Sequence, residues 1–245
     1  MDLEFSTWPE IERYLKRRTD IIIPIGSTEQ HGPMGLIGTD SICPEVIAKT
    51  ISETHDILVA PTIKLGMSQH HLCFPGSITL RPATLIAVVQ DVVRSLITHG
   101  FTHLFFLNGH GGNVAPVTTA FSEIYTDHSL AQDQASVHLH LWSWFSGTRV
   151  RNLSDLSFGE ANGSHATPSE LSLSFYAFPD KEKREELSPA QSTKTNFRDC
   201  YDFKNNFPDG RMGADSSLAT AALGKKFHEF ALEDFLEEYQ DFYQV

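Results

Sequence analysis

Three groups of residues combine imidazole and carboxylate side chains at spacings that suit a metal site. In residues 26–33 (GSTEQHGP), Glu29 and His31 are two positions apart, so in an extended backbone their side chains project to the same side. A carboxylate and an imidazole that converge in this way suit Zn²⁺, Mn²⁺ or Fe²⁺. The glycines that follow let the chain loop back and bring Asp40 to the same place. Asp40 could equally be a helix N-cap, with Glu29 exposed in a loop.

The second group is centred on His110, in residues 108–113 (NGHGGN). Glycines on both sides let backbone and substrate approach this histidine closely. A tight glycine turn in which His110 has no role is one alternative. A phosphate-binding loop is another, because a helix is expected to follow, although the Lys of a P-loop is absent.

The third group, residues 164–170 (SHATPSE), contains His165 and Glu170. Thr167 and Glu170 have the spacing of a helix capping box, with Pro168 at the first helical position. Glu170 could therefore be a metal ligand or only the cap of its helix. A histidine such as His165 is, taken alone, more typical of a packed or surface residue than of a catalyst.

The elements that must position these groups alternate between apolar strands and amphipathic helices, and this order predicts βαβ crossovers in an α/β fold with a mostly parallel sheet covered on both faces. Ligands bind such sheets at the carboxyl ends of the strands. The first two groups follow expected strand ends, and the third lies in the loop region after the fourth strand. Residues 180–211 are polar and irregular, which is typical of a loop or of a contact with another subunit. The expected strands are residues 20–26, 57–63, 102–107 and 136–142, and the expected helices are residues 40–55, 82–99 and 114–125, with one or two more in residues 215–245.

The amino-acid composition limits the classes of protein to which this chain can belong. The 245 residues fit one domain, residues 1–245, and 40% hydrophobic with 20% charged residues is ordinary globular usage. A formal charge of −12 argues against binding to nucleic acid. No apolar run is long enough to span a membrane, and the N-terminus lacks the order of a secretory signal. The three scattered cysteines indicate a reducing, cytoplasmic location.

Taken together, these groups resemble the creatininase (creatinine amidohydrolase) family in order and spacing over roughly residues 20 to 175. The pairing of EQHGP with NGHGGN is specific. The runs that carry the resemblance are residues 25–33, 38–40 (GTD), 74–77 (FPGS), 108–113 and 165–170.

The resemblance implies a three-layer α/β/α sandwich, usually assembled as a homohexamer, with two divalent metal ions (Zn, Mn or Fe) per subunit. It also implies hydrolysis of an amide, cyclic amide or formamide C–N bond in a small molecule by a metal-activated water. His165 matches the position of a proton-transfer histidine, and Asp40 would bridge the two ions. The implied metal ligands are Glu29, His31, Asp40, His110 and Glu170.

Departures from the family pattern argue against creatinine as the substrate. Creatinine-cleaving members carry a Glu ligand where this chain has Gly112, and Trp and acidic residues where it has residues 161–164 (ANGS). Thr167 replaces a Gly found in many relatives, which makes the loop before Glu170 stiffer. An alternative function is an inactive scaffold that binds a metal or a small molecule. A serine hydrolase is disfavoured, because no G-x-S-x-G motif is present.

Overall fold

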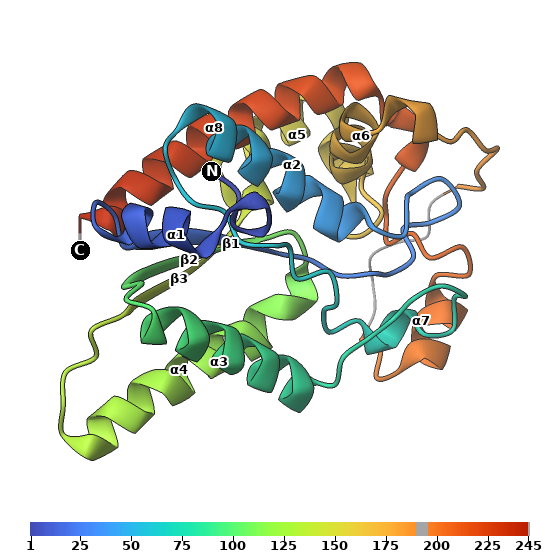
Figure 1. Cartoon of the computed structure of the whole chain (residues 1–245). Coiled ribbons are helices and arrows are strands. Elements are labelled where there is room, and N and C mark those ends of the chain that lie inside the picture. Colours follow the sequence, from blue (N-terminus) through green and yellow to red (C-terminus); the bar gives the residue numbers. More distant parts are fainter. Residues whose placement is uncertain (190–195, 245) are drawn as a thin grey trace.

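A computed structural model describes residues 1–189 and 196–244 of the chain (Figure 1). Its centre is a parallel sheet of three strands, which lie side by side in the order β1-β2-β3. The alternation of strands and helices in the sequence therefore predicted the direction of the strands correctly. The strands are β1 (Asp20–Ile25), β2 (His103–Asn108) and β3 (His138–Ser143).

Helices cover both faces of this sheet. In Figure 1, α3 and α4 lie on one side of the strands, and α2, α5, α6 and α8 lie on the other. The expected three-layer α/β/α sandwich is confirmed. The α-helices are α1 (Trp8–Leu15), α2 (Thr39–Thr54), α3 (Pro82–Thr98), α4 (Val114–Ala131), α5 (Thr148–Phe158), α6 (Pro168–Ala177), α7 (Cys200–Asn206) and α8 (Ala221–Tyr243). Short 3₁₀ turns are η1 (Leu3–Phe5), η2 (Gln69–His71), η3 (Gly111–Asn113), η4 (Trp144–Ser146), η5 (Gly159–Asn162), η6 (Pro179–Lys181) and η7 (Ser216–Leu218).

The strands alternate between two hydrophobic cores. Ile21 and Ile23 of β1 and Phe106 of β2 pack with residues of α3 and α4. Ile22 and Phe105 point the other way and pack with residues of α2 and α8. All five side chains are fully buried, which explains why β1 reads as a continuous apolar run rather than as an alternation.

The second expected strand, residues 57–63, is not part of the regular sheet. It runs beside β1 and forms only isolated parallel bridges, centred on Val59 and Ile63. The carbonyl of Pro24 in β1 accepts a hydrogen bond from Ile63 of this segment. In a strand the carbonyl and the nitrogen of one residue point to the same side, so the nitrogen of Pro24 also faces the segment, but it carries no hydrogen to donate. The segment is also out of step with β1, because its donors to that strand, Ala60 and Ile63, are three residues apart. Pro24 and this extra residue explain the broken pairing.

The C-terminal region forms one long helix, α8, preceded by the short turn η7. Residues 180–211 hold the end of η6 and helix α7, while residues 190–195 lie outside the described residues. Within the described part of the chain, no helix has the length and apolar character needed to cross a membrane.

A buried carboxylate ties the two ends of the chain to the sheet. Asp20, at the start of β1, is fully buried. Its carboxylate accepts hydrogen bonds from Arg18, from Tyr14 at 3.1 Å and from Tyr239 of α8. Burial alone would raise the pKa of Asp20, but the hydrogen bonds from Arg18 and Tyr239 outweigh it and lower the pKa.

The carboxyl ends of β1 and β2 meet because Ile25 pairs with Asn108. The glycine that follows each strand allows the start of α2 to approach closely. A Cβ on Gly26 would lie 2.2 Å from the carbonyl oxygen of Asp40, and a Cβ on Gly109 would lie 2.0 Å from it. Only glycine fits at these two positions, and the consequence is that Asp40 sits directly over both strand ends.

Candidate metal centre

The five residues expected to bind metal converge at this edge of the sheet. They come from the loop after β1, the first turn of α2, the loop after β2 and the first turn of α6. Their side chains are buried except for that of Glu170, which is 15% exposed. These residues are Glu29, His31, Asp40, His110 and Glu170.

Glu29, Asp40 and His110 form one potential set of ligands. His110 Nδ1 lies 3.0 Å from Asp40 Oδ2, and His110 Nε2 lies 3.3 Å from Glu29 Oε2. One atom from each residue can be chosen so that all three lie within 4.8 Å of one another. A carboxylate pair with one imidazole suits Zn²⁺, Mn²⁺ or Fe²⁺.

His31, Asp40 and Glu170 form a second potential set within the same limit of 4.8 Å. His31 Nε2 lies 3.1 Å from Asp40 Oδ1 and 3.9 Å from Glu170 Oε2. Asp40 belongs to both sets and turns one oxygen toward each, so its carboxylate lies where a ligand shared by two ions would be needed.

Glu170 has both of the roles that its sequence position left open. Its Oε1 accepts a hydrogen bond of 2.6 Å from the backbone N–H of Thr167, and its own N–H donates to Thr167 Oγ1 at 3.2 Å. This is a complete capping box at the start of α6. The other oxygen, Oε2, faces His31. One carboxylate thus caps the helix and points into the centre.

Three buried oxygens of this cluster have imidazole nitrogens nearby but no aligned hydrogen bond. Glu29 Oε1, Glu29 Oε2 and Asp40 Oδ2 are inaccessible to solvent and have no hydrogen-bond partner among the described residues. Leaving a buried carboxylate unsatisfied costs several kcal/mol, on the order of 3–5 when a charge loses its partner. Divalent cations would satisfy these oxygens, and carboxylate and imidazole are suitable donors. The residues therefore fit a pair of divalent metal ions.

The two imidazoles of the centre hold protons tightly when no cation balances the carboxylates. Burial opposes protonation of His31, but the charges of Asp40, Glu170 and Glu29 outweigh it and raise the pKa of His31 to about 10. Burial likewise opposes protonation of His110, and Glu29 and Asp40 raise the pKa of His110 to about 9. Protons here occupy positions that metal cations would take.

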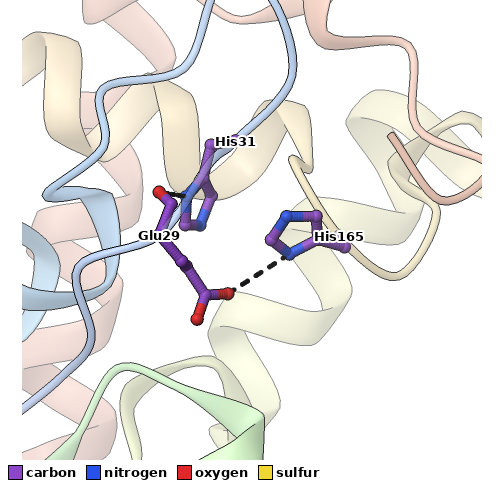
Figure 2. A group of neighbouring side chains, drawn as sticks. All are labelled: Glu29, His31 and His165. Atoms are coloured by element: carbon purple, nitrogen blue, oxygen red, sulfur yellow. Dashed lines mark hydrogen bonds and ion pairs between the residues drawn. The ribbon is translucent and has the colours of Figure 1, made fainter. Parts of the chain in front are cut away.

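His165 also faces the centre, and Figure 2 shows it beside Glu29 and His31. Its Nε2 lies 2.8 Å from the backbone carbonyl of Gln30. The side-chain Nε2 of Gln30, a hydrogen-bond donor, lies 3.0 Å from the same His165 nitrogen. When His165 Nε2 donates to the carbonyl, Nδ1 keeps a lone pair, and Nδ1 lies 3.8 Å from Glu29 Oε1. Together with Glu29 and His31, His165 forms a third potential ligand set within 4.8 Å.

His71 is a part of this region whose role the sequence did not assign. Its Nε2 lies 3.2 Å from Glu29 Oε1, and its ring stacks on His165 at 4.3 Å. The side-chain Nε2 of Gln30 lies 3.0 Å from both His71 Nδ1 and His165 Nε2, so it lies between the two rings. The only sequence signal was the position of His71 just before residues 74–77, one of the runs that resemble the creatininase family.

Burial keeps His71 and His165 neutral. It lowers the pKa of His71 to about 2, with a further contribution from His70. Burial, followed by the neighbouring His71 and His31, lowers the pKa of His165 well below its usual range. A neutral His165 with a free Nδ1 can accept a proton.

A cavity of about 400 Å³ opens beside the centre, within the range of small-molecule sites. Trp144 and Phe145 give it an aromatic wall, and Arg151 and Asp155 of α5 add charged groups. From the centre itself, the lining includes Asp40, His110, His165 and Glu170.

Gly112 is enclosed on the side of the centre. A Cβ at this position would lie 2.4 Å from His110 Nε2 and 2.5 Å from the carbonyl oxygen of Met67. A glutamate ligand at this position, as in creatinine-cleaving members of the family, would require His110 or the backbone near Met67 to move.

The chain is similar in sequence to several known proteins. The chain is 30% identical over 185 residues to a creatinine amidohydrolase of Pseudomonas putida, covering 71% of this chain and 70% of that one. A mycofactocin precursor peptide peptidase of Mycolicibacterium smegmatis is 35% identical over 106 residues, 41% of this chain and 42% of the other. A 3-dehydro-scyllo-inosose hydrolase of Thermotoga maritima is 33% identical over 106 residues, 43% and 34% of the two chains.

Solved structures share the fold. A crystal structure of creatinine amidohydrolase superposes with a TM-score of 0.87 at 22% identity, covering 98% of this chain and 97% of the other. Structures described as a Zn-Zn form of a creatininase mutant and as a Mn creatininase match with TM-scores of 0.85 and 0.84, at 21% and 22% identity, and each covers 98% of this chain and 97% of the other. Residues 4–239 match the family model described as creatinine amidohydrolase, and the chain therefore belongs to the creatininase family.

Proposed function

We propose that this chain is a metal-dependent hydrolase that cleaves a C–N bond in a small molecule other than creatinine. The observation that carries the proposal is the pair of ligand sets that share Asp40, with three buried carboxylate oxygens that have no hydrogen-bond partner among the described residues. Relatives named as an amidohydrolase and a peptidase support a hydrolase of C–N bonds.

In this proposal Glu29, Asp40 and His110 hold one divalent ion, and His31, Asp40 and Glu170 hold the other. Zn or Mn suits both sets, since each offers imidazole nitrogen and carboxylate oxygen. When bound in such a site, two divalent ions lower the pKa of water and polarise a carbonyl oxygen. The side chains of this protein carry out the proton transfers.

His165 would move the proton of the reaction. Its Nδ1 faces the centre, and because burial lowers its pKa the ring is neutral at pH 7, holds the proton of the attacking water only transiently and releases it readily. The protonated ring then gives this proton to the leaving nitrogen, which departs as a neutral amine. The hydrogen bond from Nε2 to the carbonyl of Gln30 fixes the ring orientation during both transfers.

The residues around the centre support a substrate other than creatinine. Gly112 cannot be replaced by a glutamate ligand without displacing His110 Nε2 or the carbonyl of Met67. In the loop before His165, Gly163 has a φ of +64° and a Cβ there would lie 2.4 Å from the backbone nitrogen of Ala214. The loop therefore offers small and polar groups where creatinine-cleaving members have Trp and acidic residues.

The test measures both the metal content of the protein and its hydrolytic activity. Elemental analysis of the wild type should give about two divalent ions per subunit after metal-replete purification, whereas Glu29→Gln should lose about one. His103→Ala is the matched control, because His103 stacks on His138 outside the centre. The loaded wild type should release amine from at least one member of a panel of cyclic amides, formamides and short peptides.

Absence of bound metal under these conditions would refute the proposal. Two bound ions without hydrolysis of any panel member would instead favour an inactive binding scaffold. Loss of metal in His103→Ala as well would mean that the effect of Glu29→Gln is not specific to the centre.

A further inference from the structure

Two of the three cysteines lie next to one another although they are far apart in the sequence. Cys73 follows η2 by two residues, and Cys200 is the first residue of α7. Cys200 lies one helical turn before Lys204, whose Nζ reaches the carbonyl of Cys73, so α7 brings the two thiols to the same place, and both side chains are partly accessible to solvent. Cys43, in contrast, is buried within α2.

Contacts other than the thiols hold these two segments together. Lys204 of α7 donates a hydrogen bond of 3.3 Å to the carbonyl of Cys73, and its Nζ lies 4.2 Å from the centre of the Phe74 ring. Phe74 also packs edge-on against Phe203 of α7 at 6.2 Å. The juxtaposition of the thiols is therefore built into the packing of α7 on the segment after η2.

We propose that Cys73 and Cys200 are a reversible modification site, at which exchange with a low-molecular-weight disulfide produces an intramolecular cross-link. The oxidant belongs to the class of glutathione-type disulfides. This inference does not depend on the proposed hydrolase function, because it concerns two thiols outside both ligand sets.

The exchange proceeds in two balanced steps. The thiolate of Cys200 attacks one sulfur of the small disulfide, whose S–S bond breaks and releases one small thiolate. Cys73 then loses its proton to solvent, and its sulfur attacks Cys200 and releases the second small thiolate. Two protein thiols are oxidised and one small disulfide is reduced to two thiols.

The order of the two attacks follows from the environment of Cys73. The hydrogen bond with Cys200, followed by burial, raises the pKa of Cys73 to about 11. Cys73 therefore stays protonated at neutral pH, and the first attack is assigned to Cys200. Cys43 is buried within α2 and therefore does not compete.

The cross-link would act on one wall of the metal centre. Phe203 of α7 packs edge-on against His71 at 4.6 Å and against His165 at 6.3 Å. In the reduced protein only non-covalent contacts hold α7 in this place. A bond from its first residue to Cys73 would fix Phe203 against both rings and slow local opening of the helix.

The experiment begins with the full, reduced chain, treated with oxidised glutathione and freed of excess reagent. Thiol titration in denaturant should fall from three thiols per chain to one, with a mass lower by two hydrogen atoms, and dithiothreitol should reverse both changes. Cys43→Ser is the matched control and should still form the cross-link. Cys73→Ser and Cys200→Ser should each fail to form it.

Hydrogen exchange then tests the consequence for α7. Amides of residues 200–206 should exchange at least about threefold more slowly in the oxidised protein than in the reduced one. Cys73→Ser should show the same rate under both conditions. Equal rates in the oxidised and reduced wild type would overturn the inferred effect on α7. Three remaining thiols, a stable mixed disulfide with glutathione, or a disulfide between two chains would overturn the site itself.

Discussion

The double role of Glu170 leads to a prediction in which two substitutions act on different properties. Glu170→Gln keeps a side-chain oxygen that can accept the N–H of Thr167, so the cap of α6 should survive. It removes one of three carboxylates that face the centre. Thr167→Ala removes the hydroxyl that accepts from the N–H of Glu170, at 3.2 Å, and leaves the carboxylate in place.

The expected magnitudes differ accordingly. Loss of an N-cap hydroxyl costs about 1 kcal/mol, so Thr167→Ala should lower the melting temperature by about 2–4 °C. Residues that hydrogen-bond to a metal ligand typically contribute 10–100-fold to metal affinity, and a carboxylate that binds the metal itself should contribute at least the upper end of that range. Glu170→Gln should therefore weaken one site by about 100-fold or more, or about 2.7 kcal/mol.

The assay is elemental analysis after gel filtration in metal-free buffer, with thermal melts of the same samples with and without added Mn²⁺ or Zn²⁺. Thr167→Ala should keep two ions per subunit and melt lower in both conditions. Glu170→Gln should keep one ion and show a smaller rise in melting temperature on addition of metal. If Glu170→Gln kept both ions, Glu170 would be a helix cap alone and the second ligand set would be refuted.

Three further predictions follow from neighbouring features. Metal binding at pH 7 should release protons, because the carboxylates outweigh burial and hold the pKa values of His31 and His110 at about 10 and about 9. Calorimetry of metal binding in two buffers of different ionisation enthalpy should give different binding heats, and equal heats would contradict proton release from His31 and His110. Metal affinity should also fall at acid pH. Tyr239→Phe should lower the free energy of unfolding by about 1–3 kcal/mol at pH 7, measured with urea, because its hydroxyl donates to the buried carboxylate at the start of β1. Since the folded pKa of that carboxylate is lowered, its stabilisation is present above about pH 4 and is lost as pH falls through the folded pKa; a wild type equally stable at pH 3 and 7 would exclude it. Gly112→Ala should reduce metal content at the His110 site, because its Cβ would lie 2.4 Å from His110 Nε2, whereas Gly111→Ala, whose Cβ meets nothing within 4 Å, should keep both ions.

Local sequence patterns were enough to predict the type of most elements and the residue types of the centre. The apolar periodicity of α3 and the β-branched run of β1 have direct physical causes, since each must bury one or both faces. The placement of Glu29 and His110 just after strands followed from the same reading, because parallel strands deliver their carboxyl ends to one edge. These properties depend on residues close together in the sequence.

Tertiary contacts decided what local patterns left open. Residues 57–63 have strand composition, but Pro24 in the neighbouring strand withholds a hydrogen bond, and this could be known only once the pairing was known. Asp40 lies between two ligand sets because glycines at two strand ends admit α2, a contact between distant segments.

The same distinction explains the remaining features of the site. The capping box of Glu170 was visible in the sequence, but the direction of its second oxygen depends on how α6 packs against the loop that carries His31. The meeting of His71 with His165, and of Cys73 with Cys200, joins segments about a hundred residues apart. Sequence determined which chemical groups this chain has and which local structures present them. The tertiary structure alone decided which of those groups share one buried space, because that choice depends on long-range packing.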